Sequence, residues 1–215
     1  MRKFWLIVSS IIMVANLMAQ SANEALLAGE LTWYGIDYSR VKLIGEFNQF
    51  GDAGVKSESE IRDKYFPAWN ELVLKEANKY DIKSAFRKDN VIYDLDIVNL
   101  RNSKVNPAQM VSVSDSDRNH LNENTVQAIV SEYPVSGEGY GLVFIAESLD
   151  KPTEKGNYYV VLFDKASKKV VLNKKLAGKA AGIGIRNYWA RSYYEVLEQS
   201  KANYKKWLKE SMAKN

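Results

Sequence analysis

Three apolar stretches near the C-terminal end decide the fold: Gly141–Ser148 (GLVFIAES), Tyr158–Asp164 (YYVVLFD) and Lys169–Leu176 (KVVLNKKL). Each is rich in β-branched and aromatic residues, a composition typical of β-strands. The last two are joined by residues 165–168 (KASK), a connection short enough for a hairpin. The sequence therefore predicts three consecutive strands, the last two of them antiparallel.

Two more strands are predicted toward the N-terminus. Leu31–Ile44 (LTWYGIDYSRVKLI) has strand composition, with a break expected near Asp37. Residues 91–97 alternate between apolar and polar side chains, which is the period-two pattern of a strand with one polar face. Together with the C-terminal strands they predict a mixed sheet of about five strands.

Helix signals separate these strands. Ser57 and Glu60 have capping-box spacing, and Pro67 can open a second helical stretch, so a two-part helix is expected from about 58 to 80. Asn122 is a suitable N-cap for a short helix that ends before Pro134. Apolar residues at helical intervals predict a long final helix from about 186 to 212. The resulting fold class is α/β (α+β), with helices packed on one or both faces of the sheet.

The first twenty residues have the three parts of a secretory signal peptide. Arg2 and Lys3 give a positive end, Phe4–Val14 is apolar, and Ala19 is small and precedes a polar segment. The alternative is an uncleaved membrane anchor, although a spanning helix needs about 20 apolar residues. We expect residues 1–20 to be removed and the protein to work in the periplasm or outside the cell.

Residues 21–215 are expected to form a single α/β domain without disulfides. The chain has no cysteine, which excludes disulfides, thiolate metal sites and attachment through a lipid-modified cysteine. A chain of this length can bury enough surface to be stable by its core alone. No second apolar stretch is long enough to span a membrane, so the mature chain is expected to be soluble.

Charge is distributed unevenly along the chain. Residues 21–150 contain 13 basic and 21 acidic residues, whereas residues 151–215 contain 15 basic and 5 acidic residues. The net charge of +4 falls to +2 without Arg2 and Lys3, so no strong basic stripe for nucleic acid is expected. The asymmetry indicates either an anionic partner for the C-terminal segment or two segments whose charges mingle on one surface.

Two stretches, Leu142–Ser148 with Tyr158–Asp164, and Gly182–Ser192 (GIGIRNYWARS), resemble a group of uncharacterised exported α/β proteins. The likeness is strongest at Gly182–Ser192 and implies no activity. The order of the elements is more distantly similar to small modules of cell-envelope assembly proteins, such as the N-terminal domain of TolB. That similarity concerns topology, and topology does not assign function.

The strongest candidate site is the glycine-rich stretch between the last strand and the final helix. Gly178, Gly182 and Gly184 could bring backbone N–H groups close to an anion at the helix N-terminus, and Lys179 and Arg186 could add positive charge. The spacing matches neither the dinucleotide fingerprint nor the Walker A pattern. A tight turn that needs glycine for close packing explains the same residues.

Other candidates have simpler structural explanations. Asp115, Asp117 and Asn119 match the first ligands of a calcium loop, but His120 stands where glycine is needed and Val126 where glutamate is needed. His120 is the only histidine and is expected in an exposed loop, not in a catalytic triad.

Two further clusters of side chains could act on or bind a ligand. Asp94 and Asp96 could form an acid/base pair on one face of a strand. Alternatively, they simply mark the solvent side of a half-buried strand. Four aromatic residues of the final helix could offer a ligand platform, although their spacing is typical of core packing: Tyr188, Trp189, Tyr193 and Tyr194.

No motif for a cofactor, a metal or a catalytic nucleophile is present. We therefore expect a non-catalytic binding or envelope-assembly module whose partner is an envelope protein or an anionic surface component. One alternative is a hydrolase of glycans that uses carboxylates, which leave little local signature in a sequence. The other is attachment to an anionic surface through the basic C-terminal segment.

Overall fold

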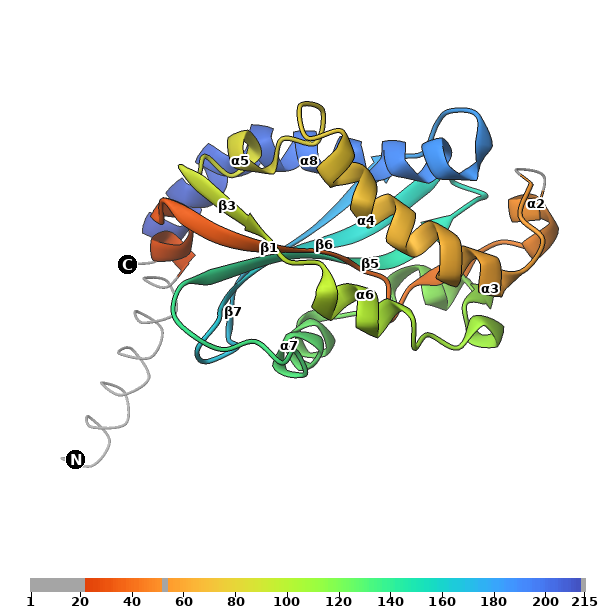
Figure 1. Cartoon of the computed structure of the whole chain (residues 1–215), viewed down its shortest axis with the longest axis horizontal. Helices are drawn as coiled ribbons and strands as arrows, with labels where there is room; N and C mark the ends of the chain where they lie inside the picture. The colour runs from red at the N-terminus through yellow and green to blue at the C-terminus, as the bar shows by residue number, and fades with distance from the viewer. Residues whose placement is uncertain (1–21, 52–53, 214–215) are drawn as a thin grey trace, which may run out of the picture.

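The computed structural model describes residues 22–51 and 54–213 (Figure 1). The signal peptide predicted over residues 1–20 lies outside them. Within the described ranges, no helix has the length and apolar character needed to cross a membrane. The fold is mixed α/β, with a sheet and a long C-terminal helix, as the sequence predicts.

Three long strands form the antiparallel part of the sheet: β5 (Tyr140–Asp150), β6 (Lys155–Asp164) and β7 (Val170–Lys179). They are the three predicted C-terminal strands, each extended by a few residues. β6 lies between β5 and β7, and β7 forms one edge of the sheet. The side chains of β5 are buried on both faces, which explains why the strand is a nearly continuous apolar run.

Four shorter strands complete the sheet: β1 (Glu30–Asp37), β2 (Lys42–Ile44), β3 (Asn90–Tyr93) and β4 (Val111–Ser112). β1 and β2 lie end to end along β5 and run parallel to it. The break expected within residues 31–44 is therefore confirmed. β3 pairs in parallel with β1, and β4 with β2.

The strand predicted over residues 91–97 is wrong beyond Tyr93. Helix α6 (Asp96–Asn102) begins there. The Oδ1 atom of Asp94 accepts a 3.2 Å hydrogen bond from the backbone N–H of Asp96, which turns the chain into the helix. Asp94 and Asp96 thus do not share a strand face.

Four of the remaining helices agree in position with the sequence signals: α3 (Glu58–Glu60), α4 (Phe66–Lys75), α7 (Glu123–Ser131) and α8 (Gly184–Met212). The sequence signals predict no helix at α2 (Phe47–Gly51) or α5 (Ile82–Ala85). The π-helical segment η1 (Ile61–Tyr65) joins α3 to α4, so the two-part helix is confirmed, although it ends at Lys75. Residues 22–27 are also helical. Asn122 caps α7 through the backbone N–H of Thr125.

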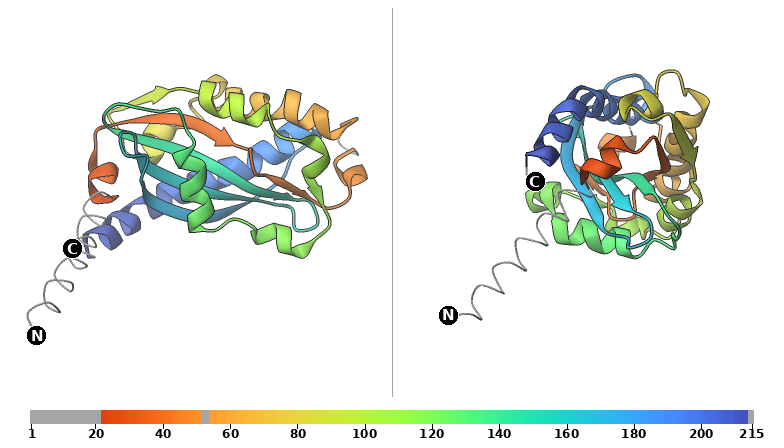
Figure 2. Two further views of the ribbon diagram at one scale, coloured as in Figure 1. Left: turned by 90° about the horizontal axis from the view of Figure 1, so that it is seen from below. Right: turned by 90° about the vertical axis from the view of Figure 1, so that its left-hand side faces the viewer.

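Helices cover both faces of the sheet (Figures 1 and 2). α4, α5 and α8 lie on one face, over a core that includes Trp69, Phe144 and Trp189. α7 lies on the opposite face, over a smaller core that includes Val130, Tyr133 and Phe163.

Candidate functional site

The structure divides the predicted anion-binding stretch between two elements. Gly178 and Lys179 belong to β7, so the expected turn begins only at Ala180. A Cβ atom at Gly178 would overlap the backbone carbonyl oxygen of Ser192 in α8. Gly178 pairs with Gly156 on β6, where a Cβ atom would meet the Ser192 side chain. This glycine pair allows the helix to rest directly on the sheet, as the packing alternative predicts.

Gly182 lies in the bend before α8 and Gly184 is the first residue of α8, with φ angles of +120° and +76°. Both glycines border a cavity of about 220 Å³, and the positively charged residue in its lining is Lys151. The ammonium group of Lys151 lies 4.0 Å from the centre of the Tyr188 ring. Neither Lys179 nor Arg186 lines this cavity, so the structure does not bring the five predicted residues together.

The residues of the proposed calcium loop have other partners. They form the 3₁₀ segment η3 (Asp115–Asn119). Asp115 forms an ion pair with Arg118, and the Asn119 side chain accepts a 2.8 Å hydrogen bond from Lys175. In the part of the chain that the structure describes, no group of three or more His, Asp or Glu residues could hold a metal ion.

The aromatic residues of α8 belong mainly to the core. Trp189 and Tyr193 are buried, with Trp189 stacked on Phe50 at 6.0 Å and Tyr193 edge-on to Phe144 at 4.9 Å. Tyr188 and Tyr194 are half-buried. Core packing, which the helical spacing favours, is thus confirmed for the two buried rings.

A polar region that the sequence did not reveal lies where β1 gives way to β2. The pairing of β1 with β5 ends at Asp37↔Ile145, and β2 resumes it at Lys42↔Ser148. Residues 38–41 therefore lie opposite only two residues of β5. The register of β5 against β6 shifts at the same place. Such irregularities redirect side chains and are common beside functional sites. We call residues 38–41 the kink.

Asp37, the last residue of β1 before the kink, is fully buried. Its Oδ1 atom accepts a 2.7 Å hydrogen bond from the backbone N–H of Ser39. Its Oδ2 atom accepts bonds from the Tyr133 hydroxyl at 2.7 Å and from Nε of Arg101 at 3.1 Å. Burial, together with the negative charge of Asp37, raises the pKa of Tyr133 well above its usual value. The carboxylate is thus neutralised and fully hydrogen-bonded inside the protein.

Two more buried carboxylates lie on β5. Glu147 accepts a 2.9 Å hydrogen bond from the backbone N–H of Leu121 and forms an ion pair with Lys175. Asp150 accepts a 2.6 Å hydrogen bond from Nε of Arg118. A buried charge left without a partner is strongly destabilising, so these cations are structural requirements.

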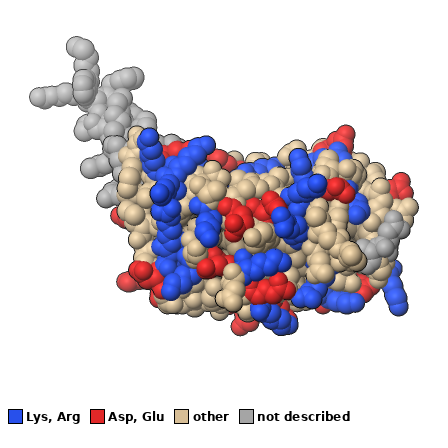
Figure 3. Space-filling model, turned by 90° about the horizontal axis from the view of Figure 1, so that it is seen from above, with Lys and Arg blue, Asp and Glu red and all other residues tan. Residues whose placement is uncertain are grey.

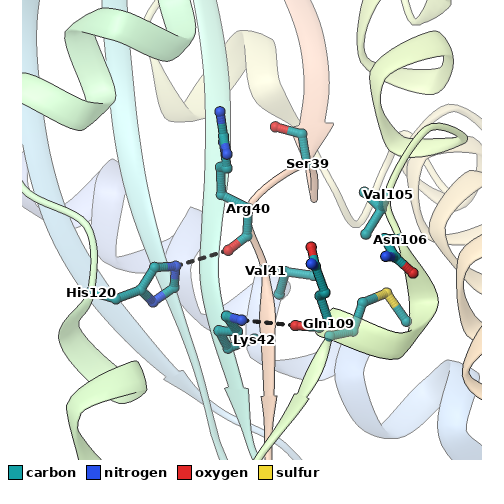
Figure 4. A pocket seen from close by; sticks show the side chains of 9 residues that line it. Ser39, Arg40, Val41, Lys42, Val105, Asn106, Gln109 and His120 are labelled. Carbon is teal, nitrogen blue, oxygen red and sulfur yellow. Dashed lines mark hydrogen bonds between the residues drawn. The ribbon is translucent and has the colours of Figure 1, made fainter.

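The kink itself opens onto a pocket of about 200 Å³ (Figure 4). The kink, the start of β2, the neighbourhood of the 3₁₀ segment η2 (Pro107–Gln109) and His120 provide its lining: Ser39, Arg40, Val41, Lys42, Val105, Asn106, Gln109, Met110 and His120. No carboxylate is among them. Nζ of Lys42 donates a 2.7 Å hydrogen bond to the Gln109 carbonyl. Arg40 is exposed and forms no ion pair with the described residues.

His120 fixes one wall of this pocket. Its Nε2 atom lies 2.9 Å from the carbonyl oxygen of Arg40, and its Nδ1 atom lies 2.8 Å from that of Asp117. The expectation of an exposed histidine is wrong, because the ring is half-buried and ties the kink to η3.

Sequence reasoning missed the residues of this region for a physical reason. Asp37 ends a strand and Glu147 interrupts an apolar run, and each could equally have faced solvent. The sequence did offer one signal: a glutamate inside the apolar run LVFIAES, because a buried charge needs a partner elsewhere in the fold. Arg40 and Lys42 carry no local signature, because the pocket that they line depends on the register of β5. Comparison of the chain with protein-family models, with curated proteins and with solved structures found no match.

Proposed function

We propose that this protein is a non-catalytic binding module that takes an anionic group of its ligand or partner into the pocket at the kink. One observation carries the proposal: Arg40 and Lys42 line the pocket, and no carboxylate does. The nearby acids cannot balance this charge, because Asp37 and Asp150 already have their own arginines. The pocket therefore attracts negative charge.

The lining suits a small carboxylate or phosphate group. Arg40 offers a planar fork of N–H donors, which matches the oxygens of such groups. Lys42 keeps two donors after its bond to Gln109. Asn106 and Gln109 add polar side chains to the lining, with Gln109 next to Lys42 (Figure 4).

The carboxylate arrangement favours binding over hydrolysis. A glycosidase needs two acidic groups that face one substrate across about 5–9.5 Å. Asp94 and Asp96 do not offer such a pair, because Asp94 lies in the turn between β3 and α6, whereas Asp96 is the first residue of α6. Asp37 and Glu147 are buried and paired with cations. Turnover of a panel of glycans by the wild-type protein would overturn the non-catalytic part of the proposal.

We further propose that binding takes place outside the cytoplasm, at the cell envelope, because residues 1–20 have the composition of a signal peptide. Expression of the full chain in a bacterium with an outer membrane tests this. We expect N-terminal sequencing of the exported protein to begin near Gln20 or Ser21. Full-length protein confined to the cytosol would contradict export.

The pocket is tested with two double variants of equal charge change. Arg40→Gln with Lys42→Gln removes both cations of the pocket, and Lys179→Gln with Arg186→Gln removes the cations of the glycine-rich stretch. Binding of inorganic phosphate and of citrate is measured by NMR titration at low and high salt. We expect the first double variant to bind at least tenfold more weakly, and the second to bind like wild type.

The alternative results have clear meanings. Loss of binding only in the Lys179, Arg186 variant would move the site to the glycine-rich turn. Equal binding by both variants and the wild type would refute the proposal. Thermal unfolding of each variant shows whether it is folded.

A further inference from the structure

We infer that the outer face of α8, near its C-terminal end, is a docking surface for an anionic lipid bilayer. This surface is separate from the pocket at the kink, and the inference does not depend on ligand binding there. It names the residues and the kind of surface for the attachment that the basic C-terminal segment suggests.

A row of lysines defines the surface. Lys201, Lys205 and Lys209 follow one another at intervals of four residues, which places them on one side of α8. All three are exposed, and none forms an ion pair with the described residues. We call them the lysine row. Figure 3 shows Lys and Arg side chains gathered in a stripe across the end of the molecule where α8 finishes.

The acidic residues of α8 do not neutralise the row. Glu195 forms an ion pair with Arg191, and Glu210 forms one with Lys174. Glu198 is exposed on the same side as the row and leaves it with a net positive charge. Arg87 lies against α8, with its guanidinium group 4.9 Å from the centre of the Tyr204 ring, and extends the basic surface onto the segment after α5.

Apolar side chains accompany the positive charge. Met212 is 48% exposed and, three residues after Lys209, continues the row on the same side of the helix. Leu27 is 56% exposed at the end of the helical residues 22–27. Positive charge with exposed apolar side chains is the combination that binds the interface of an anionic bilayer. A soluble polyanion would have no use for Leu27 and Met212.

The start of the described chain lies at the same end of the molecule. The Tyr204 hydroxyl donates a 2.5 Å hydrogen bond to the Leu26 carbonyl, which joins α8 to residues 22–27. The buried Lys88 donates to the carbonyls of Ala25, Leu26 and Ala28 at 2.9, 2.6 and 2.7 Å. The apolar run Phe4–Val14 therefore precedes a segment that is fixed beside the lysine row.

The test is co-sedimentation of the purified protein with vesicles of phosphatidylcholine, with and without 30% phosphatidylglycerol. We expect binding only to the anionic vesicles, and weaker binding at high salt. The triple variant Lys201→Gln, Lys205→Gln, Lys209→Gln should bind roughly 100-fold more weakly, since each basic residue near such a surface contributes about fivefold. All proteins are prepared as the exported form that begins at Ser21, so the apolar run Phe4–Val14 does not contribute to binding.

A matched control removes three exposed lysines elsewhere: Lys56→Gln, Lys104→Gln, Lys155→Gln. It should bind like wild type, and an equal loss in both triple variants would overturn the inference. A further variant, Leu27→Asn with Met212→Asn, should weaken binding to vesicles but not to dextran sulfate. If this variant binds both vesicles and dextran sulfate like wild type, and dextran sulfate binds as tightly as the vesicles, the occupant is a polyanion and not a bilayer. Wild-type binding by the lysine-row variant would also refute the inference.

Discussion

The hydroxyl of Tyr133 donates a 2.7 Å hydrogen bond to the buried carboxylate of Asp37, 96 positions earlier in the chain. This bond joins the segment after α7 to the end of β1. Arg101, in α6, forms an ion pair with the same carboxylate. The strand β1, the helix α6 and the segment after α7 are thus all held by one buried charge beside the kink.

Arg101→Met should destabilise the fold by about 3–5 kcal/mol, because Asp37 would remain buried without its cation. Adding Asp37→Asn should recover much of this loss, since a neutral amide needs no cation: its oxygen can accept the bond from the Ser39 N–H, and its NH2 group can donate to the Tyr133 hydroxyl. Urea unfolding of both single variants and the double variant measures the coupling. Additive effects would show that the pair does not interact in the folded protein.

Gly178→Ala should destabilise the protein by about 1–3 kcal/mol or more, because its Cβ atom would overlap the backbone of Ser192. Gly156→Ala meets the Ser192 and Tyr158 side chains instead and should cost less, as side chains can rotate. Lys179→Ala, at the exposed next position, is the control. Thermal unfolding ranks the three, and a harmless Gly178→Ala would mean that α8 does not lie as close to β7 as described.

Trp189→Ala should destabilise the fold by about 3–5 kcal/mol, because the ring is only 3% exposed and packs on Phe50. Tyr188→Ala, at the neighbouring half-buried ring, should have a clearly smaller effect. Chemical denaturation followed by tryptophan fluorescence and circular dichroism checks both. A Trp189→Ala variant as stable as wild type would revive the ligand-platform interpretation.

Stability should fall at alkaline pH because of the buried tyrosines. Burial raises the pKa of Tyr80 to about 12, and raises those of Tyr158 and Tyr193 still further. The unfolded chain has tyrosine pKa values near 10, so it loses protons first. The stabilisation is therefore complete below about pH 10 and is lost as the pH rises through the folded-state values.

Tyr80→Phe isolates one of these groups. The Tyr80 hydroxyl makes only a long bond of 3.4 Å to the Ala190 carbonyl, so the neutral-pH stability should change little. Between pH 10 and 12 the decline should be shallower than in wild type, by at most about 1.4 kcal/mol per pH unit, the limit for a difference of one proton. Identical pH profiles for the two proteins would show that Tyr80 is not protected from solvent.

The sequence by itself determined the elements whose signal is local. The apolar runs of β5 and β6 predict buried strands because each side chain on both faces must leave water. Asn122 predicts the start of α7 because its side chain satisfies a free N–H group of the first turn. The spacing of Trp189 and Tyr193 predicts the buried side of α8 because a helix repeats every 3.6 residues.

Only the tertiary structure decided the polar region. The strand predicted through Ile97 failed because the chain turns after Tyr93 into α6, with the Asp94 side chain bonded to the N–H of Asp96, a turn that alternation cannot reveal. Lys179 and Arg186 are close in sequence, yet β7 and α8 place them outside one cavity. Arg40 and His120 are distant in sequence but meet, because the register of β5 expels residues 38–41 from the sheet. Local patterns fix helices and strands, whereas sites made of charges depend on long-range register, which no short stretch of sequence encodes.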